Sequence, residues 1–426
     1  MSRNIPMTTV DTDALAERFR TVRRFTEELA EPLSAEDCAV QSMPDVSPTR
    51  WHLAHTTWFF DTFLLSQKSG YRAFDTMYAY LFNSYYNVVG NQFPRSQRGL
   101  ITRPGLAEVM EYRRHVDAQM MNLLTSEDGQ NERLAEVTEI GIQHEQQHQE
   151  LILTDIKHVL SHSPLRPTYR QGTFAGGDDE VLSKWNSYDE GIYWIGHEGD
   201  DFCFDNEQPR HRAFLERFQL ASQLVTCGDY LRFIEDGGYD RPELWLSLGW
   251  DTARQHEWES PLYWYRDDGQ WFEFTLAGPV PIDPDRPVCH VSYFEADAFA
   301  RWADARLPTE SEWEIVSSDV PIEGRFADQL WTHNRVIHPC REDPDLNSVP
   351  SMFGNVWQWT ASPYTPYPGY QPPRGALGEY NGKFMCNQYV LRGGSCATSS
   401  SHIRSTYRNF FPPEARWQFT GIRLCR

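Results

Sequence analysis

The chain has 426 residues, 40% of them apolar and 14% aromatic, so it is long enough to bury the cores of two or three domains. Its 60 acidic residues outweigh 39 basic ones, and the net charge of −21 argues against nucleic acid or an anionic membrane as a partner. Without an apolar signal segment or a long apolar run, and with eight dispersed cysteines lacking a C-x-x-C pair, the chain is expected to work in the cytoplasm and not to enter a membrane.

Helical patterns dominate residues 11 to about 160, and they predict a helical bundle over residues 1–165. For the second helix, Ser47 is the expected N-cap and Pro48 the first helical residue. The three clearest segments are DALAERFRTVRRFTEEL (13–29), SPTRWHLAHTTWFFDTFLL (47–65) and AEVTEIGIQHEQQHQELILTDIKHVL (135–160).

The texture changes after the last of these helices. Prolines, glycines and acidic residues predict a linker over residues 166–184. Beyond it, short β-type runs, many aromatic residues and frequent turn residues predict an irregular α+β domain over residues 185–426. The clearest β-type runs are EGIYWIGHEG (190–199), QLASQLVTCGDY (219–230) and YVLRGGSCA (389–397).

Two histidines in the third helical segment have the spacing of a metal half-site. His144 and His148 are four residues apart, so their rings project from one helix face and can chelate one ion. The alternative is that two polar residues on a solvated helix face happen to be histidines. A third histidine nearby would favour the metal.

The second helical segment supplies a candidate for this third ligand. His55 shares an apolar helix face with Trp51 and Phe59, each four residues away, and His52 is the competing candidate. A buried histidine that faces two more is costly unless it is ligated or hydrogen-bonded, so we expect a three-histidine site across two helices. Three imidazoles suit zinc and ferrous iron about equally.

The segment HEQQH (144–148) also fits the H-E-x-x-H pattern of zinc metalloproteases, in which Glu145 would be the general base. The extended pattern requires glycine and histidine where this chain has Leu151 and Thr154. His55 could replace the missing third ligand, so a zinc hydrolase stays open as a distant alternative.

Two groups of motifs together resemble one enzyme family. WHLAH (51–55) and HEQQHQE (144–150) resemble the DinB-like four-helix domain of ergothioneine-biosynthesis sulfoxide synthases. The second domain resembles the formylglycine-generating enzymes, whose fold is C-type-lectin-like. The motifs that carry this second resemblance are YFEADAFARWADARLPTESEWE (293–314), FGNVWQWTASPY (353–364), VLRGGS (390–395) and FTGIRL (419–424).

The resemblance implies an α+β protein that joins a thiol sulfur to C2 of the imidazole of hercynine (trimethylhistidine) and forms a sulfoxide. Making the C–S bond removes two electrons and oxidising sulfur removes two more, which together reduce one O2; redox-inert zinc could not do this. The implied ligands of Fe(II) are His55, His144 and His148. Copper chemistry is not expected, because the copper-binding cysteines of formylglycine enzymes are replaced at about Thr398 and Ile403.

The resemblance also assigns substrate and catalytic residues in the helical domain. Arg95 and Arg98 match a clamp for the carboxylate of the thiol substrate. Gln147 matches the side chain that hydrogen-bonds the hercynine imidazole. Tyr85 and Tyr86 resemble the paired tyrosines of the cysteine-using subgroup, one of which would donate a proton or hydrogen atom to the oxygen being reduced.

Three residues near the C-terminus complete the implied substrate site. Asn409 and Phe410 match a hercynine-binding asparagine and its aromatic neighbour, and an aromatic face suits a trimethylammonium group. Phe411 replaces the aspartate of the subgroup that uses γ-glutamylcysteine, so free cysteine is the expected thiol. Tyr380 lies near the place of that subgroup's active-site tyrosine but does not match it clearly.

The expected partners are therefore the small molecules hercynine, cysteine and O2. The same architecture also serves reactions with γ-glutamylcysteine, a selenosugar, or histidine itself as in ovothiol synthesis. A lectin-like binding module is the non-enzyme alternative, but it would leave the histidines, tyrosines and arginines of the helical domain unexplained.

Overall fold

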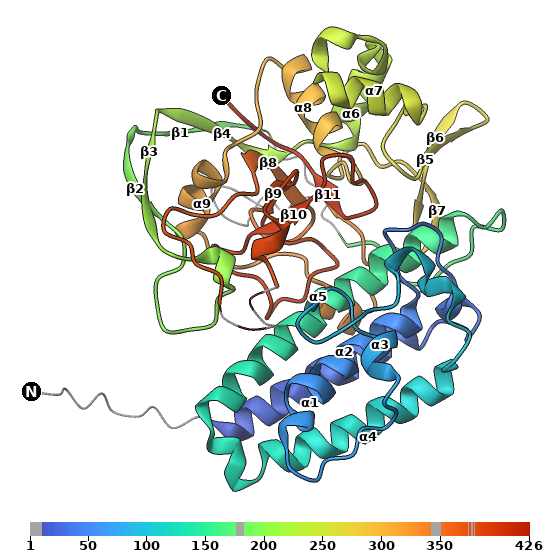
Figure 1. The fold of residues 1–426 in the computed structure, drawn as a ribbon. Helices are drawn as coiled ribbons and strands as arrows, with labels where there is room; N and C mark the ends of the chain where they lie inside the picture. Colours follow the sequence, from blue (N-terminus) through green and yellow to red (C-terminus); the bar gives the residue numbers. More distant parts are fainter. Residues whose placement is uncertain (1–10, 176–182, 342–350, 374, 376–377, 379) are drawn as a thin grey trace, which may run out of the picture. The chain divides into compact units, whose positions relative to one another are not determined.

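The computed structural model divides the chain into two units, Met1–Val159 and Leu160–Arg426 (Figure 1). It describes residues 11–175, 183–341, 351–373, 375, 378 and 380–426. Part of the predicted linker, residues 176–182, lies outside the described residues. The linker's earlier part hydrogen-bonds within the second unit, where the backbone N–H of Tyr169 donates to the carbonyl of Leu276 at 2.9 Å.

Four long helices that run beside one another form the first unit, which confirms the predicted bundle (Figure 1). They are α1 (Thr12–Ala30), α2 (Thr49–Phe63), α4 (Leu106–Leu124) and α5 (Glu132–Ser161). The connections contain the short helix α3 (Tyr78–Leu81) and the 3₁₀ segments η1 (Asp37–Ala39), η2 (Leu65–Gln67), η3 (Arg95–Leu100) and η4 (Glu127–Gln130).

The start of α2 differs from the expectation. Pro48 is the N-cap residue, because its carbonyl accepts from the N–H groups of Trp51 and His52. The prediction that Ser47 caps this helix is therefore wrong. The backbone N–H of Ser47 donates instead to a carboxylate oxygen of Asp155 on α5, at 2.8 Å, so this residue ties two helices together.

Helices α2 and α5 pack closely because a glycine lies between them. Trp58, Phe59 and Phe60 of α2 are almost fully buried. A Cβ at Gly141 of α5 would lie 2.5 Å from a ring carbon of Phe60, a separation that real Cβ atoms do not show. The absence of a side chain at Gly141 therefore sets the approach of the two helices.

The second unit contains four small sheets among the described residues, with strand orders β1-β4-β12, β10-β9-β8-β11, β2-β3 and β5-β6-β7. All pairs are antiparallel except β11 with β8. The strands are β1 (Trp185–Tyr188), β2 (Gly191–Ile195), β3 (His211–Leu215), β4 (Phe218–Leu224), β5 (Trp264–Asp267), β6 (Gln270–Thr275), β7 (Gly278–Pro281), β8 (Trp357–Pro363), β9 (Tyr389–Arg392), β10 (Asn409–Phe411), β11 (Thr420–Gly421) and β12 (Arg423–Cys425).

Short helices and 3₁₀ segments accompany these sheets, and three of the helices, α6, α8 and α9, begin with a capping box. Ser292 caps α8 together with Glu295, and Thr309 caps α9 together with Glu312. This mixture of short strands and helices confirms the predicted α+β class. The helices are α6 (Cys227–Glu235), α7 (Ser247–Gln255), α8 (Tyr293–Trp302), α9 (Glu310–Ser318) and α10 (Ala327–Thr332), and the 3₁₀ segments are η5 (Asp205–Glu207), η6 (Gly238–Asp240), η7 (Pro242–Leu244) and η9 (Gly382–Phe384).

None of the helices described in either unit is both long and apolar enough to cross a membrane.

Candidate metal centre

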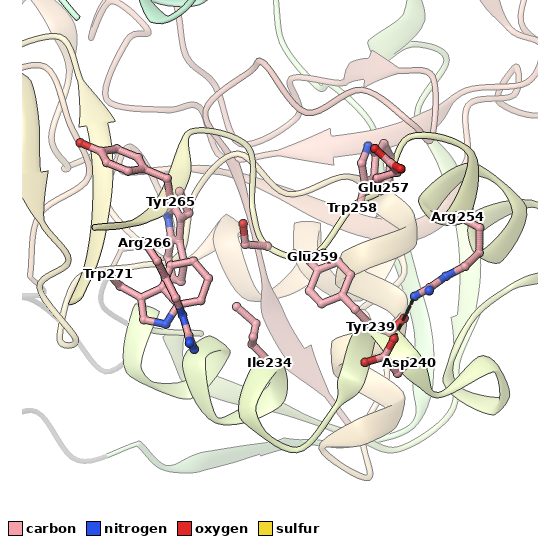
Figure 2. A pocket seen from close by; sticks show the side chains of 12 residues that line it. Ile234, Tyr239, Asp240, Arg254, Glu257, Trp258, Glu259, Tyr265, Arg266 and Trp271 are labelled. Carbon is pink, nitrogen blue, oxygen red and sulfur yellow. Dashed lines mark hydrogen bonds and ion pairs between the residues drawn. The ribbon is translucent and has the colours of Figure 1, made fainter. Parts of the chain in front are cut away.

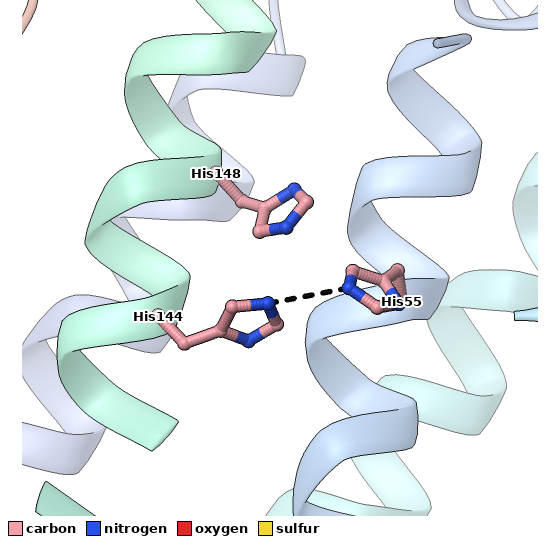
Figure 3. A group of neighbouring side chains, drawn as sticks. All are labelled: His55, His144 and His148. Carbon is pink, nitrogen blue, oxygen red and sulfur yellow. Dashed lines mark hydrogen bonds between the residues drawn. The ribbon is translucent and has the colours of Figure 1, made fainter. Parts of the chain in front are cut away.

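Three histidines of the first unit point toward one another from two helices (Figure 3). His55 comes from α2, and His144 and His148 come from successive turns of α5. One potential ligand atom from each lies within 4.8 Å of the other two, and all three side chains are buried. The Nε2 atoms of His55 and His144 are 3.2 Å apart.

All three imidazoles are held in the neutral form, which is the form that binds metal ions. Burial, followed by the neighbouring His144, holds the pKa of His55 well below its usual value. Burial lowers the pKa of His144 to about 3, and burial with the other two histidines lowers the pKa of His148 as well. The cluster therefore offers nitrogen lone pairs in buried surroundings.

The tautomer of His55 is fixed by a backbone contact. Its Nδ1 lies 2.6 Å from the carbonyl oxygen of Phe82, which can only accept a hydrogen bond. The proton of the neutral ring therefore lies on Nδ1, and the lone pair on Nε2 faces His144. A carbonyl that orients a histidine in this way is a common support for a metal ligand.

These residues fit a divalent transition-metal ion. Two imidazole nitrogens that bind one ion at about 2.1 Å are about 3.0–3.4 Å apart for angles between square and tetrahedral. The separation of 3.2 Å between His55 and His144 lies in this range. Three nitrogen donors leave further coordination positions for substrates, as in catalytic sites.

His52, the competing candidate, lies outside this group. Its Nδ1 is 2.8 Å from Nδ1 of His148, and its Nε2 is 3.0 Å from a carboxylate oxygen of Asp155. Both ring nitrogens of His52 are therefore engaged within the protein. The three-residue group that the described part of the structure offers contains His55 instead.

Two tryptophans hold the ring of His55 between them. Trp51 stacks on it with ring centres 4.5 Å apart, and Trp58 stacks with ring centres 5.5 Å apart, each tilted by only 14°. Both come from α2, one turn before and one turn after His55. The sandwich restricts ring rotation and excludes water. This role of the two indoles was not predicted from the sequence, although their helical spacing was the available signal.

Glu145 does not face the histidines, which removes the general base of the zinc-hydrolase alternative. One of its carboxylate oxygens lies 2.8 Å from Arg23 and the other 3.0 Å from Arg113, and all three side chains are buried. Burial alone would raise the pKa of Glu145, but the two guanidinium groups lower it to about 2. This carboxylate is committed to an ion-pair network inside the bundle.

Of the two predicted clamp arginines, only Arg98 is buried. It donates to the hydroxyls of Ser47 and Ser84 at 2.9 and 3.0 Å, and its guanidinium lies 3.3 Å from the ring centre of Trp51. No carboxylate of the described residues is within salt-bridge distance of Arg98, and burial, followed by Arg95, lowers its pKa. Arg95 is exposed and donates to the carbonyl of Asp45 at 2.5 Å.

The predicted tyrosines connect to the histidine cluster through Trp58. Tyr85 and Tyr86 stack with ring centres 4.8 Å apart, and Tyr86, fully buried, lies 5.7 Å from Trp58. Burial is the main cause that raises the pKa of Tyr85 to about 12, so its phenol keeps its proton at neutral pH.

Gln147 lies between His144 and His148 on α5 and is half-buried.

The residues predicted in the second unit lie on strand β10. Phe410 stacks on Tyr364 with ring centres 4.0 Å apart, and the Asn409 side-chain oxygen accepts from the backbone N–H of Phe410 at 2.9 Å. Phe411 meets Trp417 edge to face at 5.8 Å. All three predicted side chains are half-buried. Tyr380 is buried and stacks on Phe204.

A separate pocket of about 950 Å³ opens in the second unit (Figure 2). Tryptophans and charged side chains line it, and one ion pair, Arg254 with Asp240, crosses part of its wall at 3.3 Å. None of the site residues predicted from the sequence lines this pocket.

Two family models together match both halves of the chain. Residues 18–152 match the model of the DinB superfamily, and residues 187–426 match that of the sulfatase-modifying factor enzyme 1-like domain. The chain is thus a two-part protein with a DinB-type helical unit and a formylglycine-enzyme-type unit.

Curated relatives, one of which matches nearly the whole chain, narrow this class. The chain is 30% identical to hercynine oxygenase of Mycolicibacterium smegmatis over 97% of this chain and 98% of that protein. It is 32% identical to the hercynine oxygenase of Mycolicibacterium thermoresistibile over 66% of this chain and 67% of that protein, and 34% identical to that of Mycobacterium tuberculosis over 53% and 56%. The chain belongs to the hercynine oxygenase family, the sulfoxide synthases of ergothioneine biosynthesis. Its enzyme class is that of an oxygenase.

Proposed function

We propose that this chain is an Fe(II)-dependent enzyme that joins the sulfur of cysteine to C2 of the hercynine imidazole. In the balanced reaction, one thiol, one imidazole C–H and one O2 give one sulfoxide and one water. The observation that carries the proposal is the buried cluster of neutral His55, His144 and His148 in a member of the hercynine oxygenase family.

Iron is the metal that suits this reaction. Fe(II) held by the three histidines would collect the thiol, the imidazole and O2 and pass electrons between them, which redox-inert zinc cannot do. A zinc hydrolase would need Glu145 as its general base, but this carboxylate is ion-paired to Arg23 and Arg113.

Arg98 supports recognition of an anionic substrate. Among the described residues the buried guanidinium of Arg98 has no carboxylate within salt-bridge distance, although the charge of Asp155 acts on it, and a substrate carboxylate could supply a direct partner. We assign Arg98 as the inner contact and Arg95, on the exposed side of η3, as the outer one. Trp51 contacts both groups, because the guanidinium of Arg98 lies over its ring and the ring of His55 stacks on it.

Tyr85 is our choice for the proton donor. Its raised pKa keeps the phenol protonated, and such a group can deliver a proton to the oxygen being reduced. Tyr86 is fully buried against Trp58 and Phe63 and would hold Tyr85 in place by stacking.

We assign hercynine recognition to Gln147, Asn409 and Phe410, by resemblance to the family. The side-chain amides would hydrogen-bond the imidazole and the carboxylate, and the aromatic face suits a trimethylammonium group. Phe411 has no carboxylate to pair with the ammonium of a γ-glutamyl group, unlike the aspartate of the γ-glutamylcysteine-using subgroup, so free cysteine is the proposed thiol.

The proposal is tested by loading the full-length protein with Fe(II) under anaerobic conditions and adding hercynine, O2 and either cysteine or γ-glutamylcysteine. Mass spectrometry should find hercynylcysteine sulfoxide from cysteine, and one O2 consumed for each product. His144→Ala should abolish the product, while His115→Ala, a histidine of α4 outside the cluster, should not. O2 consumption without coupled product, or activity with zinc alone, would refute the assignment.

A further inference from the structure

His52 lies between a proposed metal ligand and a buried carboxylate. Its Nδ1 is 2.8 Å from Nδ1 of His148, and its Nε2 is 3.0 Å from Oδ2 of Asp155. The three side chains are 2%, 7% and 3% exposed, so water does not compete for these hydrogen bonds. The two contacts form one continuous series of hydrogen bonds that ends at the candidate metal site.

The contacts of Asp155 determine which atoms donate and which accept in this series of hydrogen bonds. Oδ2 of Asp155 already accepts the backbone N–H of Ser47 at 2.8 Å, so it acts as an acceptor. Nε2 of His52 must therefore donate to it, which leaves Nδ1 of a neutral His52 as an acceptor. Nδ1 of His148 then donates to His52.

This direction determines which nitrogen of His148 can bind an ion. With its proton on Nδ1, neutral His148 carries its lone pair on Nε2. The opposite direction would place the proton on Nε2 and block it. The proton of His55 is likewise held on Nδ1, in this case by the carbonyl of Phe82, which lies 2.6 Å from that nitrogen.

We propose that Asp155 and His52 form a hydrogen-bonded relay that orients His148 and keeps its Nε2 unprotonated for the metal ion. The proposal rests on the proposed function, because it presumes that the three histidines bind a metal. His52 and Asp155 are positioning residues in this scheme, since they act through His148 and contact neither ion nor substrate. Supports of this kind change metal affinity by about 10- to 100-fold.

The test is a titration of the metal-free, full-length protein with Co²⁺, whose visible absorption reports both affinity and ligand geometry. His52→Leu removes the relay. Asp155→Asn keeps the shape of the side chain but can donate to His52 and so reverse the series of hydrogen bonds. His52→Asn places an amide oxygen near the former Nδ1 and can still accept from His148.

We expect His52→Leu and Asp155→Asn to bind Co²⁺ about 10- to 100-fold more weakly with altered absorption bands, and His52→Asn to recover much of the affinity. His158→Leu is the matched control, because His158 is a buried histidine of α5 that hydrogen-bonds Ser42 at 2.7 Å. Its Co²⁺ affinity and spectrum should equal those of the unaltered protein.

The outcomes separate the two proposals. If the unaltered protein binds no Co²⁺, the metal site itself is refuted and the relay with it. If it binds Co²⁺ and the folded His52→Leu protein binds equally well with the same spectrum, only the relay is refuted. Where His52→Leu does not fold, the shape-conserving Asp155→Asn decides: unchanged affinity and spectrum overturn the relay, and weaker binding supports it.

Discussion

Replacing Glu145 by glutamine removes a buried negative charge from the bundle while keeping the shape of the side chain. In the native protein its two oxygens accept from Arg23 at 2.8 Å and from Arg113 at 3.0 Å. Both arginines stay buried in the variant, and each keeps a weaker or more exposed partner, Asp117 and Glu27 respectively.

The expected loss of unfolding free energy in Glu145→Gln follows from this geometry. Removing one partner of a buried ion pair costs about 3–5 kcal/mol, because an uncompensated charge is left behind. The remaining contacts of Arg23 and Arg113 place the expected loss near the lower end, at about 3 kcal/mol. Since folded proteins are stable by only about 5–15 kcal/mol, this is a large part of the total.

The assay is urea unfolding of the full-length protein, followed by circular dichroism at a wavelength dominated by helices. With slopes of about 1–3 kcal/mol per molar urea, the helix-weighted midpoint should fall by about 1 M or more. Glu136→Gln is the control on the same helix, because Glu136 and its partner Arg133 are both exposed. That change should alter stability by about 1 kcal/mol or less.

The result also tests the chemistry assigned to this helix. At a temperature where Glu145→Gln is folded, its Co²⁺ binding should match that of the unaltered protein. An unchanged urea midpoint together with lost turnover would place Glu145 in the reaction and refute the structural reasoning.

Three further predictions concern packing, substrate binding and pH. Gly141→Val should lower the melting temperature, by overpacking worth about 1–3 kcal/mol, because its Cβ would lie 2.5 Å from Phe60; Gly105→Ala, with nothing within 4 Å, should have little effect. Arg98→Lys should raise the KM for cysteine about tenfold or more and change that for hercynine less, because a lysine cannot bridge two hydroxyls and stack on an indole; equal changes in both would contradict the clamp. For Glu312, burial opposes ionisation but hydrogen bonds from Arg306 and Thr309 hold the pKa below its usual value. Its stabilising contribution is therefore full above the unfolded-state pKa and lost as pH falls through the folded-state pKa, and the acid-side stability slope should shrink in Glu312→Gln.

The bundle helices could be predicted from the sequence because their apolar spacing is strong over many turns. The spacing of His144 and His148 also predicted two of the three residues of the candidate metal centre. The choice between His52 and His55 could not be made in this way. Residues three apart differ by only about 60° around a helix, so both face inward from α2, and the decision depends on how α2 is rotated against α5.

The position of Glu145 was ambiguous for a related reason. Successive residues of a helix point about 100° apart, so Glu145 does not share the helix face of His144 and His148. The sequence does not show that Arg23 and Arg113 lie beside the adjoining face and pair with this carboxylate. The second unit was predictable in class only. Its strands are short and separated by long connections, so neither the register of Asn409 opposite Leu391 nor the stacking of Phe410 on Tyr364 follows from local patterns.

The histidines of the cluster also bear on how the first unit unfolds. His55 and His144 are 89 residues apart in the chain, whereas His144 and His148 are neighbours on one helix. An ion that needs all three ligands would bind the folded bundle and not the open chain, and so act as a removable cross-link between α2 and α5. By mass action, an ion at one hundred times its dissociation constant stabilises the folded form by about 2.7 kcal/mol. The melting temperature of the helical unit would then measure metal supply, and a protein starved of its ion would lose its fold sooner as well as its activity.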